Sequence, residues 1–125
     1  MATIFLIMTD KRIGVIDDHS HCREAIATLL RSAGFVAEGF ANANELMGAR
    51  ALSEWHCVLV DLRLHNDSGR RVADQLQQLR SDLPVIILTA HISTHDVLSS
   101  FAHRMLSKSC TADELITAIE HCTRS

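Results

Sequence analysis

The stretch "CVLVDLRLHNDSG", residues 57–69, decides how the chain folds. Its first half is an uninterrupted apolar run, which is typical of a strand buried on both faces of a parallel sheet. The run ends abruptly on Asp61, and a polar loop with a glycine follows. A carboxylate at the edge of an apolar interior is costly unless another group pairs with it. Asp61 is therefore either an ordinary loop residue or one member of a polar site.

Strand-like and helix-like patterns alternate on both sides of this stretch. Short apolar runs predict strands at residues 12–17, 35–40, 57–61, 84–90 and 104–108. Amphipathic stretches predict helices at residues 20–34, 42–53, 68–80, 94–101 and 111–122. We expect Ser20 to cap the first helix and Leu79 to point inward from the third. The alternation indicates an α/β fold, a five-stranded parallel sheet with helices on both faces.

Length and composition restrict the function classes. A chain of 125 residues is long enough for one domain with a proper core, and 47% hydrophobic and 22% charged residues are typical of a soluble globular protein. The net charge of −3 gives no reason to expect direct contact with nucleic acid, and no apolar stretch is long enough to span a membrane. We divide the chain into an N-terminal arm or extra strand at 1–10 and one domain at 11–125.

Cysteine usage indicates a reduced, cytoplasmic protein. The four cysteines, Cys22, Cys57, Cys110 and Cys122, lack the spacing of a metal knuckle or a redox pair. Three of them directly follow a histidine, which leaves a zinc or copper site open. The predicted fold, however, scatters these His-Cys pairs over different ends of the domain.

Polar residues stand where the predicted strands end. Asp17 and Asp18 follow the first strand, Asp61 ends the third, and Thr89 and Lys108 end the fourth and fifth. In an open parallel sheet, ligands bind beyond the carboxyl ends of the strands, so these side chains should converge. Three carboxylates suit a hard divalent cation, best Mg²⁺, and a lysine and a hydroxyl can hold an anion on that metal. Together they are the parts for phosphoryl transfer.

Taken singly, each residue has an ordinary structural explanation. An Asp pair before a helix can cap it and interact with its dipole. Thr89 alone is a β-branched strand residue, and Lys108 alone is a solvated charge. Only their joint placement argues for a site.

The sequence resembles response-regulator receiver domains, the phosphoacceptor half of two-component signalling, over residues 11–122. The motifs are "VIDDHS" (15–20), "VLVDLRLHNDSG" (58–69), "PVIILTA" (84–90) and "MLSK…TADELITAI" (105–119). The resemblance implies the flavodoxin-like, chemotaxis-regulator-like fold with strand order 2-1-3-4-5. The part from 61 to 90 is most similar to regulators of the nitrogen-fixation type.

Site roles follow from that resemblance. It implies that Asp61 takes a phosphoryl group from a histidine kinase or phosphotransfer protein. Asp18 and Asp61 would ligate Mg²⁺ directly, Asp17 mainly through water, and the backbone carbonyl of Arg63 would complete the protein's share. The Arg63 side chain, two residues after the acceptor, would then tune the lifetime of the phosphoryl group.

The remaining implied roles concern binding and switching. Lys108 would pair with the phosphoryl group, and the Thr89 hydroxyl would swing onto it and draw the next loop inward. Met105 stands where the family carries a switch aromatic. His91, two residues after the threonine, would be a second tuning residue.

The chain also departs from the family pattern. Ser109 follows the lysine where a proline is usual, so we expect a trans bond there, because a non-proline cis bond costs about 3 kcal/mol. The segment between Thr89 and Lys108 is roughly one helical turn short, so the fourth helix should be short or irregular. Since that helix and the fifth strand usually carry the signal, these departures concern the switch and leave the acceptor chemistry unchanged.

Three functions remain open. The first is a phosphorylatable receiver that switches a partner or an attached effector, catalyses only its own phosphorylation and dephosphorylation, and dimerises through its fourth helix, fifth strand and fifth helix. The second is a degenerate receiver, a binding module independent of phosphorylation. The third is a flavin carrier on the same fold, although the acids of "DDHSH" would repel a flavin phosphate. An effector, if attached, would by family analogy be a DNA-binding helix-turn-helix.

Overall fold

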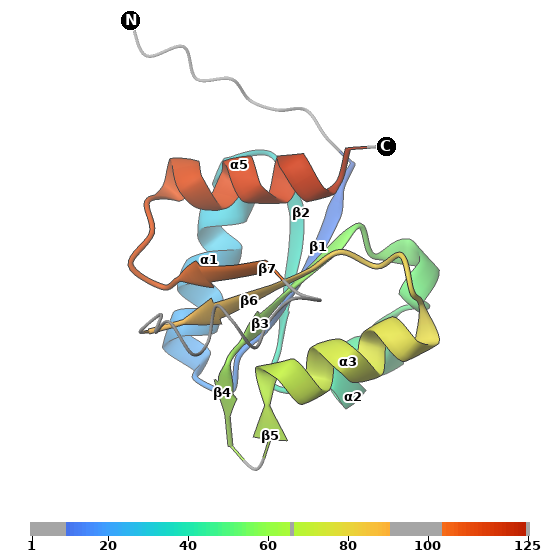
Figure 1. Cartoon of the computed structure of the whole chain (residues 1–125). Coiled ribbons are helices and arrows are strands. Elements are labelled where there is room, and N and C mark those ends of the chain that lie inside the picture. Colours follow the sequence, from blue (N-terminus) through green and yellow to red (C-terminus); the bar gives the residue numbers. More distant parts are fainter. Residues whose placement is uncertain (1–9, 66, 91–103, 125) are drawn as a thin grey trace, which may run out of the picture.

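A five-stranded parallel sheet forms the centre of the molecule. The computed structural model describes residues 10–65, 67–90 and 104–124. The strands of the sheet are β1 (Arg12–Ile16), β2 (Val36–Phe40), β3 (Cys57–Asp61), β6 (Val85–Thr89) and β7 (Arg104–Ser107). Their order is β2-β1-β3-β6-β7, which is the predicted order 2-1-3-4-5 (Figure 1). The predicted α/β receiver fold is therefore confirmed.

Helices cover both faces of the sheet (Figure 1). They are α1 (Ser20–Ser32), α2 (Ala43–Ala49), the 3-10 turn η1 (Leu52–Glu54), α3 (Gly69–Leu79) and α5 (Ala112–Cys122). One core cluster joins the sheet to α1 and α5, and a second joins it to α2 and α3. The helix predicted at 94–101 lies outside the described residues.

The middle strands explain the apolar runs of the sequence. All five residues of β3 and all five of β6 are buried. Both strands lie inside the sheet, with β1 and β7 as their outer neighbours. The two strands that end on Asp61 and Thr89 are therefore packed on both faces and paired at both edges. This packing fixes where the two side chains lie.

Two details of the predicted helices are wrong. The N-cap of α1 is His19, not Ser20, because the main-chain N–H of Arg23 already bonds the His19 carbonyl and the helix begins one residue earlier. Leu79 is 63% exposed, because it is the last residue of α3 and the buried stripe of that helix ends at Leu76.

The loop after Asp61 contains a small hairpin that periodicity did not predict. β4 (Arg63–Leu64) and β5 (Asp67–Ser68) pair antiparallel. Gly69 then opens α3, and its main-chain N–H donates to the carbonyl of Leu62 at 2.7 Å. The hairpin is thus fastened to the end of β3 at both of its ends.

The predicted scatter of the cysteines is also wrong in one instance. The Sγ atoms of Cys57 and Cys122 lie 3.9 Å apart, although 65 residues separate them in sequence. Among the residues that the structure describes, the one group able to hold a metal contains no cysteine.

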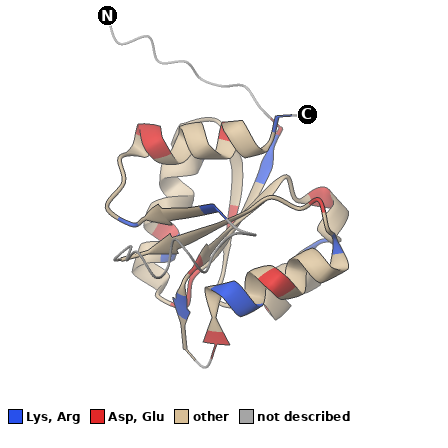
Figure 2. Ribbon diagram, in the orientation of Figure 1, with Lys and Arg blue, Asp and Glu red and all other residues tan. Residues whose placement is uncertain are grey.

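Charges of both signs are spread over the ribbon, and α1 and α3 each carry both (Figure 2). Of the helices in the described ranges, none combines the length and the apolar character that crossing a bilayer requires.

Candidate functional site

Four side chains meet beyond the carboxyl ends of β1 and β3. Asp17, Asp18 and His19 follow β1, and Asp61 is the last residue of β3. One ligand atom from each lies within 4.8 Å of the others. The predicted convergence of the three acids is therefore present, and the topology produces it because β1 and β3 are parallel neighbours.

Burial distinguishes these acids from surface carboxylates. Across the described ranges, the polar side chains classed as buried are Asp17, Asp61 and Thr89, which are 1%, 6% and 4% exposed. All three stand at the same edge of the sheet. Burying ionisable groups is unfavourable without partners, so their concentration here marks this edge as the place to look for function.

Each acid uses one oxygen to accept a main-chain N–H. Asp17 Oδ1 accepts from His19 N at 2.9 Å, and Asp61 Oδ1 accepts from Arg63 N at 3.2 Å. Asp18 Oδ2 accepts from the N–H of His65, near the tip of the hairpin. The carboxylates are thereby fixed in orientation by the backbone.

The second carboxylate oxygens of Asp17 and Asp18 face the cluster. Asp17 Oδ2 and Asp18 Oδ1 are buried, and no hydrogen bond reaches them from the described residues. Lys108 Nζ lies 3.5 Å from the former and His19 Nδ1 lies 3.1 Å from the latter. Buried carboxylate oxygens without hydrogen bonds fit a hard, oxygen-seeking cation such as Mg²⁺.

Lys108 supplies the positive charge of the site. Its Nζ donates to Asp61 Oδ2 at 2.9 Å, and its main-chain N–H donates to the Thr89 carbonyl at 2.7 Å. Partial burial alone would lower the pKa of Lys108, but the hydrogen bond and charge of Asp61, with the charge of Asp17, outweigh it, so this pKa is raised. The lysine is a stable ammonium group.

The strand ladder positions Lys108 without a proline after it. No cis peptide bond occurs in the described ranges, so the bond from Lys108 to Ser109 is trans, as predicted. The Lys108 N–H continues the β6–β7 pairing by one hydrogen bond. This bond fixes the backbone position from which the lysine side chain extends.

The other predicted site residues that the structure describes lie on three different strands. Thr89 ends β6 beside Lys108, and the Arg63 side chain is exposed at the start of β4. Met105 is half-buried on β7, opposite Ile87, and packs on the core of the α3 face. His91 lies outside the described residues.

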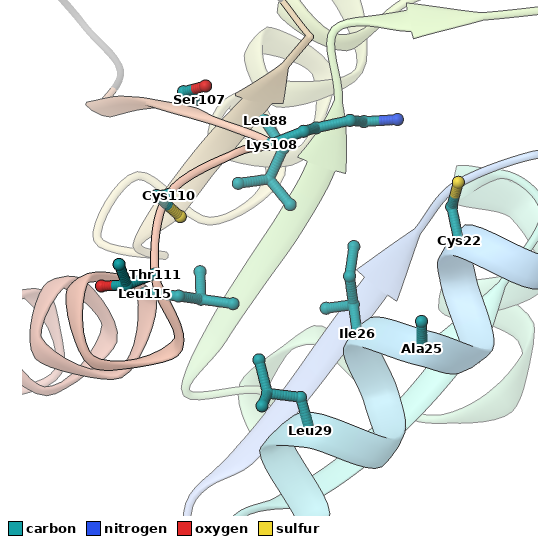
Figure 3. Close-up of a pocket in the computed structure, with 10 residues that line it drawn as sticks. All are labelled: Cys22, Ala25, Ile26, Leu29, Leu88, Ser107, Lys108, Cys110, Thr111 and Leu115. Carbon is teal, nitrogen blue, oxygen red and sulfur yellow. The ribbon is translucent and has the colours of Figure 1, made fainter.

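A cleft adjoins Lys108, and none of the three acids lines it. It has a volume of about 240 Å³ and is mostly apolar. Figure 3 shows Cys22, Ile26 and Leu29 on α1 along one wall, and Cys110 and Leu115 along the other. The Lys108 side chain crosses its mouth. The lysine thus adjoins both the acids and an apolar groove.

Two contributions to the site were not predicted from the sequence. The His65 N–H reaches Asp18 only because the hairpin folds back, and no periodic pattern announces a two-residue strand. Gly69 packs on the backbone of Asp61, since an added Cβ would lie 2.4 Å from the Asp61 carbonyl oxygen. The glycine itself was the available signal, because it stands directly after the loop.

Comparison with known proteins decides the family. The family model described as "Response regulator receiver domain" matches residues 13–120. The chain belongs to this receiver-domain family. Its acidic cluster of Asp17, Asp18 and Asp61 fits the phosphoacceptor site of a receiver domain. The predicted resemblance is confirmed.

Curated relatives agree with this assignment. The DNA-binding transcriptional regulator NtrC of Salmonella typhimurium is 32% identical over 111 residues, which are 86% of this receiver and 24% of NtrC. The response regulator protein TodT of Pseudomonas putida is 32% identical over 79 residues, which are 63% of this receiver and 35% of TodT. This receiver therefore spans about a quarter to a third of these relatives.

Solved structures give the same picture. The response regulator TrrA of Thermotoga maritima, in complex with Mg²⁺ and BeF, superposes with a TM-score of 0.78 at 29% identity over 90% of this receiver and 98% of TrrA. The apo receiver domain of nitrogen regulatory protein C gives 0.76 at 29% identity over 90% and 94%.

Proposed function

We propose that Asp61 is the phosphoacceptor of this receiver and takes a phosphoryl group from a histidine kinase or a histidine phosphotransfer protein. The observation that carries the proposal is the pairing of Asp61 Oδ2 with Lys108 Nζ at 2.9 Å, next to two buried carboxylate oxygens that no described residue hydrogen-bonds. Asp61 Oδ1 is held by the Arg63 N–H. We assign the attack on phosphorus to Oδ2, the oxygen that faces the Lys108 ammonium group.

The acidic residues would hold Mg²⁺. Asp18 and Asp61 would bind it directly, Asp17 mainly through water, and the Arg63 carbonyl would add one ligand. The bound ion supplies neutralisation of charge on the phosphoryl oxygens during transfer. The solved TrrA structure, which contains Mg²⁺ and BeF, supports this proposal by similarity.

Lys108 and Thr89 would act on the transferred group. When the phosphoryl group forms on Asp61, the Lys108 ammonium would exchange its carboxylate partner for a phosphoryl oxygen, whose negative charge also favours the protonated lysine. The Thr89 hydroxyl would bond another phosphoryl oxygen. The two residues are also joined through the main chain, because the Thr89 carbonyl accepts the Lys108 N–H.

The output of this receiver is the regulation of a partner or an attached effector. The relatives described as DNA-binding regulators are longer than this chain, which supports the receiver as one part of such a system. We place the receiver in the cytoplasm, with no direct nucleic-acid contact of its own and no turnover of an external substrate. Dimerisation would use β7, α5 and the segment 94–101. Arg63 and His91 would tune the lifetime of the phosphoryl group.

The test is incubation of the full chain with acetyl phosphate and Mg²⁺, followed by intact-mass measurement. We expect one phosphoryl group per chain, none in Asp61→Asn and none with excess EDTA. Asp82→Asn is the matched control, because it makes the same chemical change at an exposed residue paired with Arg80. If the chain gains no mass, or if Asp61→Asn gains as much as the parent chain, the chain is a degenerate receiver that binds partners without phosphorylation.

A further inference from the structure

Two cysteines face each other at the edge of the sheet opposite to the acidic cluster. Cys57 is the first residue of β3, whose last residue is Asp61, and Cys122 is the last residue of α5. Their Sγ atoms lie 3.9 Å apart. The two thiols therefore join the central strand to the C-terminal helix at a point remote from the phosphoacceptor.

The two thiols differ in access. Cys57 is fully buried in the core cluster between the sheet, α1 and α5, whereas Cys122 is half-buried at a helix end near the C-terminus of the chain. A solute in water reaches Cys122 first. Cys57 can react only with an atom that Cys122 brings to it.

The surroundings also make Cys122 the more reactive thiol. The hydrogen bond from Cys57 and the charges of Arg104 and Lys11 lower the pKa of Cys122 to about 7, although burial acts in the opposite direction. The hydrogen bond to Cys122 and burial raise the pKa of Cys57. A thiolate is the nucleophilic form of cysteine, and it resides on the accessible member of the pair.

We propose that Cys57 and Cys122 form a peroxide-sensitive dithiol that closes to an intrachain disulfide. The Cys122 thiolate attacks one oxygen of hydrogen peroxide, the O–O bond breaks, and hydroxide leaves, so that Cys122 becomes a sulfenic acid. The Cys57 sulfur then attacks the Cys122 sulfur, the S–O bond breaks, and water leaves with the Cys57 proton. Peroxide is reduced and the two thiols are oxidised.

The geometry allows the second step. A disulfide has an S–S length of about 2.05 Å. The two sulfur atoms, which now lie 3.9 Å apart, must therefore approach each other by about 2 Å. Cys122 is the last residue of α5 and is half-buried. Helix ends fray, so the last turn of α5 can supply this shift more easily than the middle of the helix.

Closure would restrain α5 against β3. Thr123 Oγ1 already accepts a hydrogen bond from Lys11 and donates to the Ile119 carbonyl, so the helix end is attached to the chain before β1 as well. The proposal does not depend on phosphoryl transfer to Asp61, because the two sites lie at opposite edges of the sheet.

The experiment treats the full reduced chain with hydrogen peroxide, alkylates the remaining thiols in denaturant, and maps the peptides by mass spectrometry. We expect the loss of two thiols per chain and a cross-linked peptide pair containing Cys57 and Cys122. The double variant Cys22→Ser/Cys110→Ser is the matched control and should form the same cross-link. Cys57→Ala should stop at a dimedone-reactive sulfenic acid on Cys122.

Two results would overturn the proposal. One is a cross-link that involves Cys22 or Cys110, or that joins two chains, in place of the pair 57–122. The other is unchanged thiol content in the parent chain under conditions that oxidise a free cysteine peptide. Since Cys57 is buried, circular dichroism checks that Cys57→Ala is folded. The parent chain and the double control decide the outcome without that variant.

Discussion

Gly69 lies directly against the backbone of Asp61. A Cβ atom at position 69 would sit 2.4 Å from the Asp61 carbonyl oxygen and 2.8 Å from the Cα of Leu62. The first residue of α3 and the last residue of β3 are therefore in backbone contact, and the position of Asp61 depends on the absence of a side chain at Gly69.

Gly69→Ala should displace the acceptor. Because the clashing atoms are backbone, they cannot rotate away, and overpacking of this kind costs about 1–3 kcal/mol. We expect a lower free energy of unfolding in urea and slower phosphorylation by acetyl phosphate. Gly48→Ala is the control, since nothing lies within 4 Å of its Cβ and alanine favours a helix by about 0.5–1 kcal/mol. Equal stability of the two variants would contradict the contact.

Magnesium should stabilise the protein through the acids. Without the ion, like charges repel, so Asp18→Asn should be more stable than the parent chain; with the ion, the order should reverse. A ligand at about 100 times its dissociation constant adds about 2.7 kcal/mol to the folded state. Thermal denaturation with and without Mg²⁺ measures both effects. Asp82→Asn should respond to Mg²⁺ as the parent chain does, and a Mg²⁺ response retained in Asp18→Asn would exclude Asp18 as a ligand.

Lys108 should give the stability a dependence on alkaline pH. Its pKa is raised in the folded chain above the value of about 10.4 expected when unfolded. A raised pKa contributes stability that is fully present below the unfolded value and is lost as pH rises through the folded value. The stability difference between the parent chain and Lys108→Met should therefore shrink above about pH 10.4. A constant difference up to pH 12 would show that the ion pair contributes nothing.

The hydroxyl of Thr89 should matter for switching more than for phosphorylation. Thr89 is buried, so valine preserves its shape and serine preserves its hydroxyl. Both variants should accept a phosphoryl group, but only Thr89→Ser should keep the NMR shift changes of β7 and α5 that phosphorylation produces. Identical spectra for the phosphorylated valine variant and the phosphorylated parent chain would remove Thr89 from the switch.

The elements and the meeting of acids and lysine followed from the sequence, because both depend on strand order and on where apolar runs end. Asp17, Asp18 and Asp61 each follow or end such a run. The sequence did not predict contacts set by chain reversal or by helix ends. The His65 N–H reaches Asp18 through a hairpin of two-residue strands, and Cys122 reaches Cys57 across 65 residues. The prediction that Leu79 points inward was wrong, because periodicity identifies the apolar face of a helix but not the residue at which the core ends.

The two oxygens of each carboxylate have different partners, and this limits how well asparagine can replace the aspartate. At Asp17, Asp18 and Asp61, one oxygen faces a main-chain donor, so an amide in its place has only one acceptable flip. Its carbonyl must face the backbone, so at position 61 its amino group must face the Lys108 ammonium group, whose hydrogen bond Asp61 Oδ2 accepts at 2.9 Å in the parent chain. Two donors then stand opposite each other, and Asp61→Asn removes the partner of Lys108 together with the carboxylate.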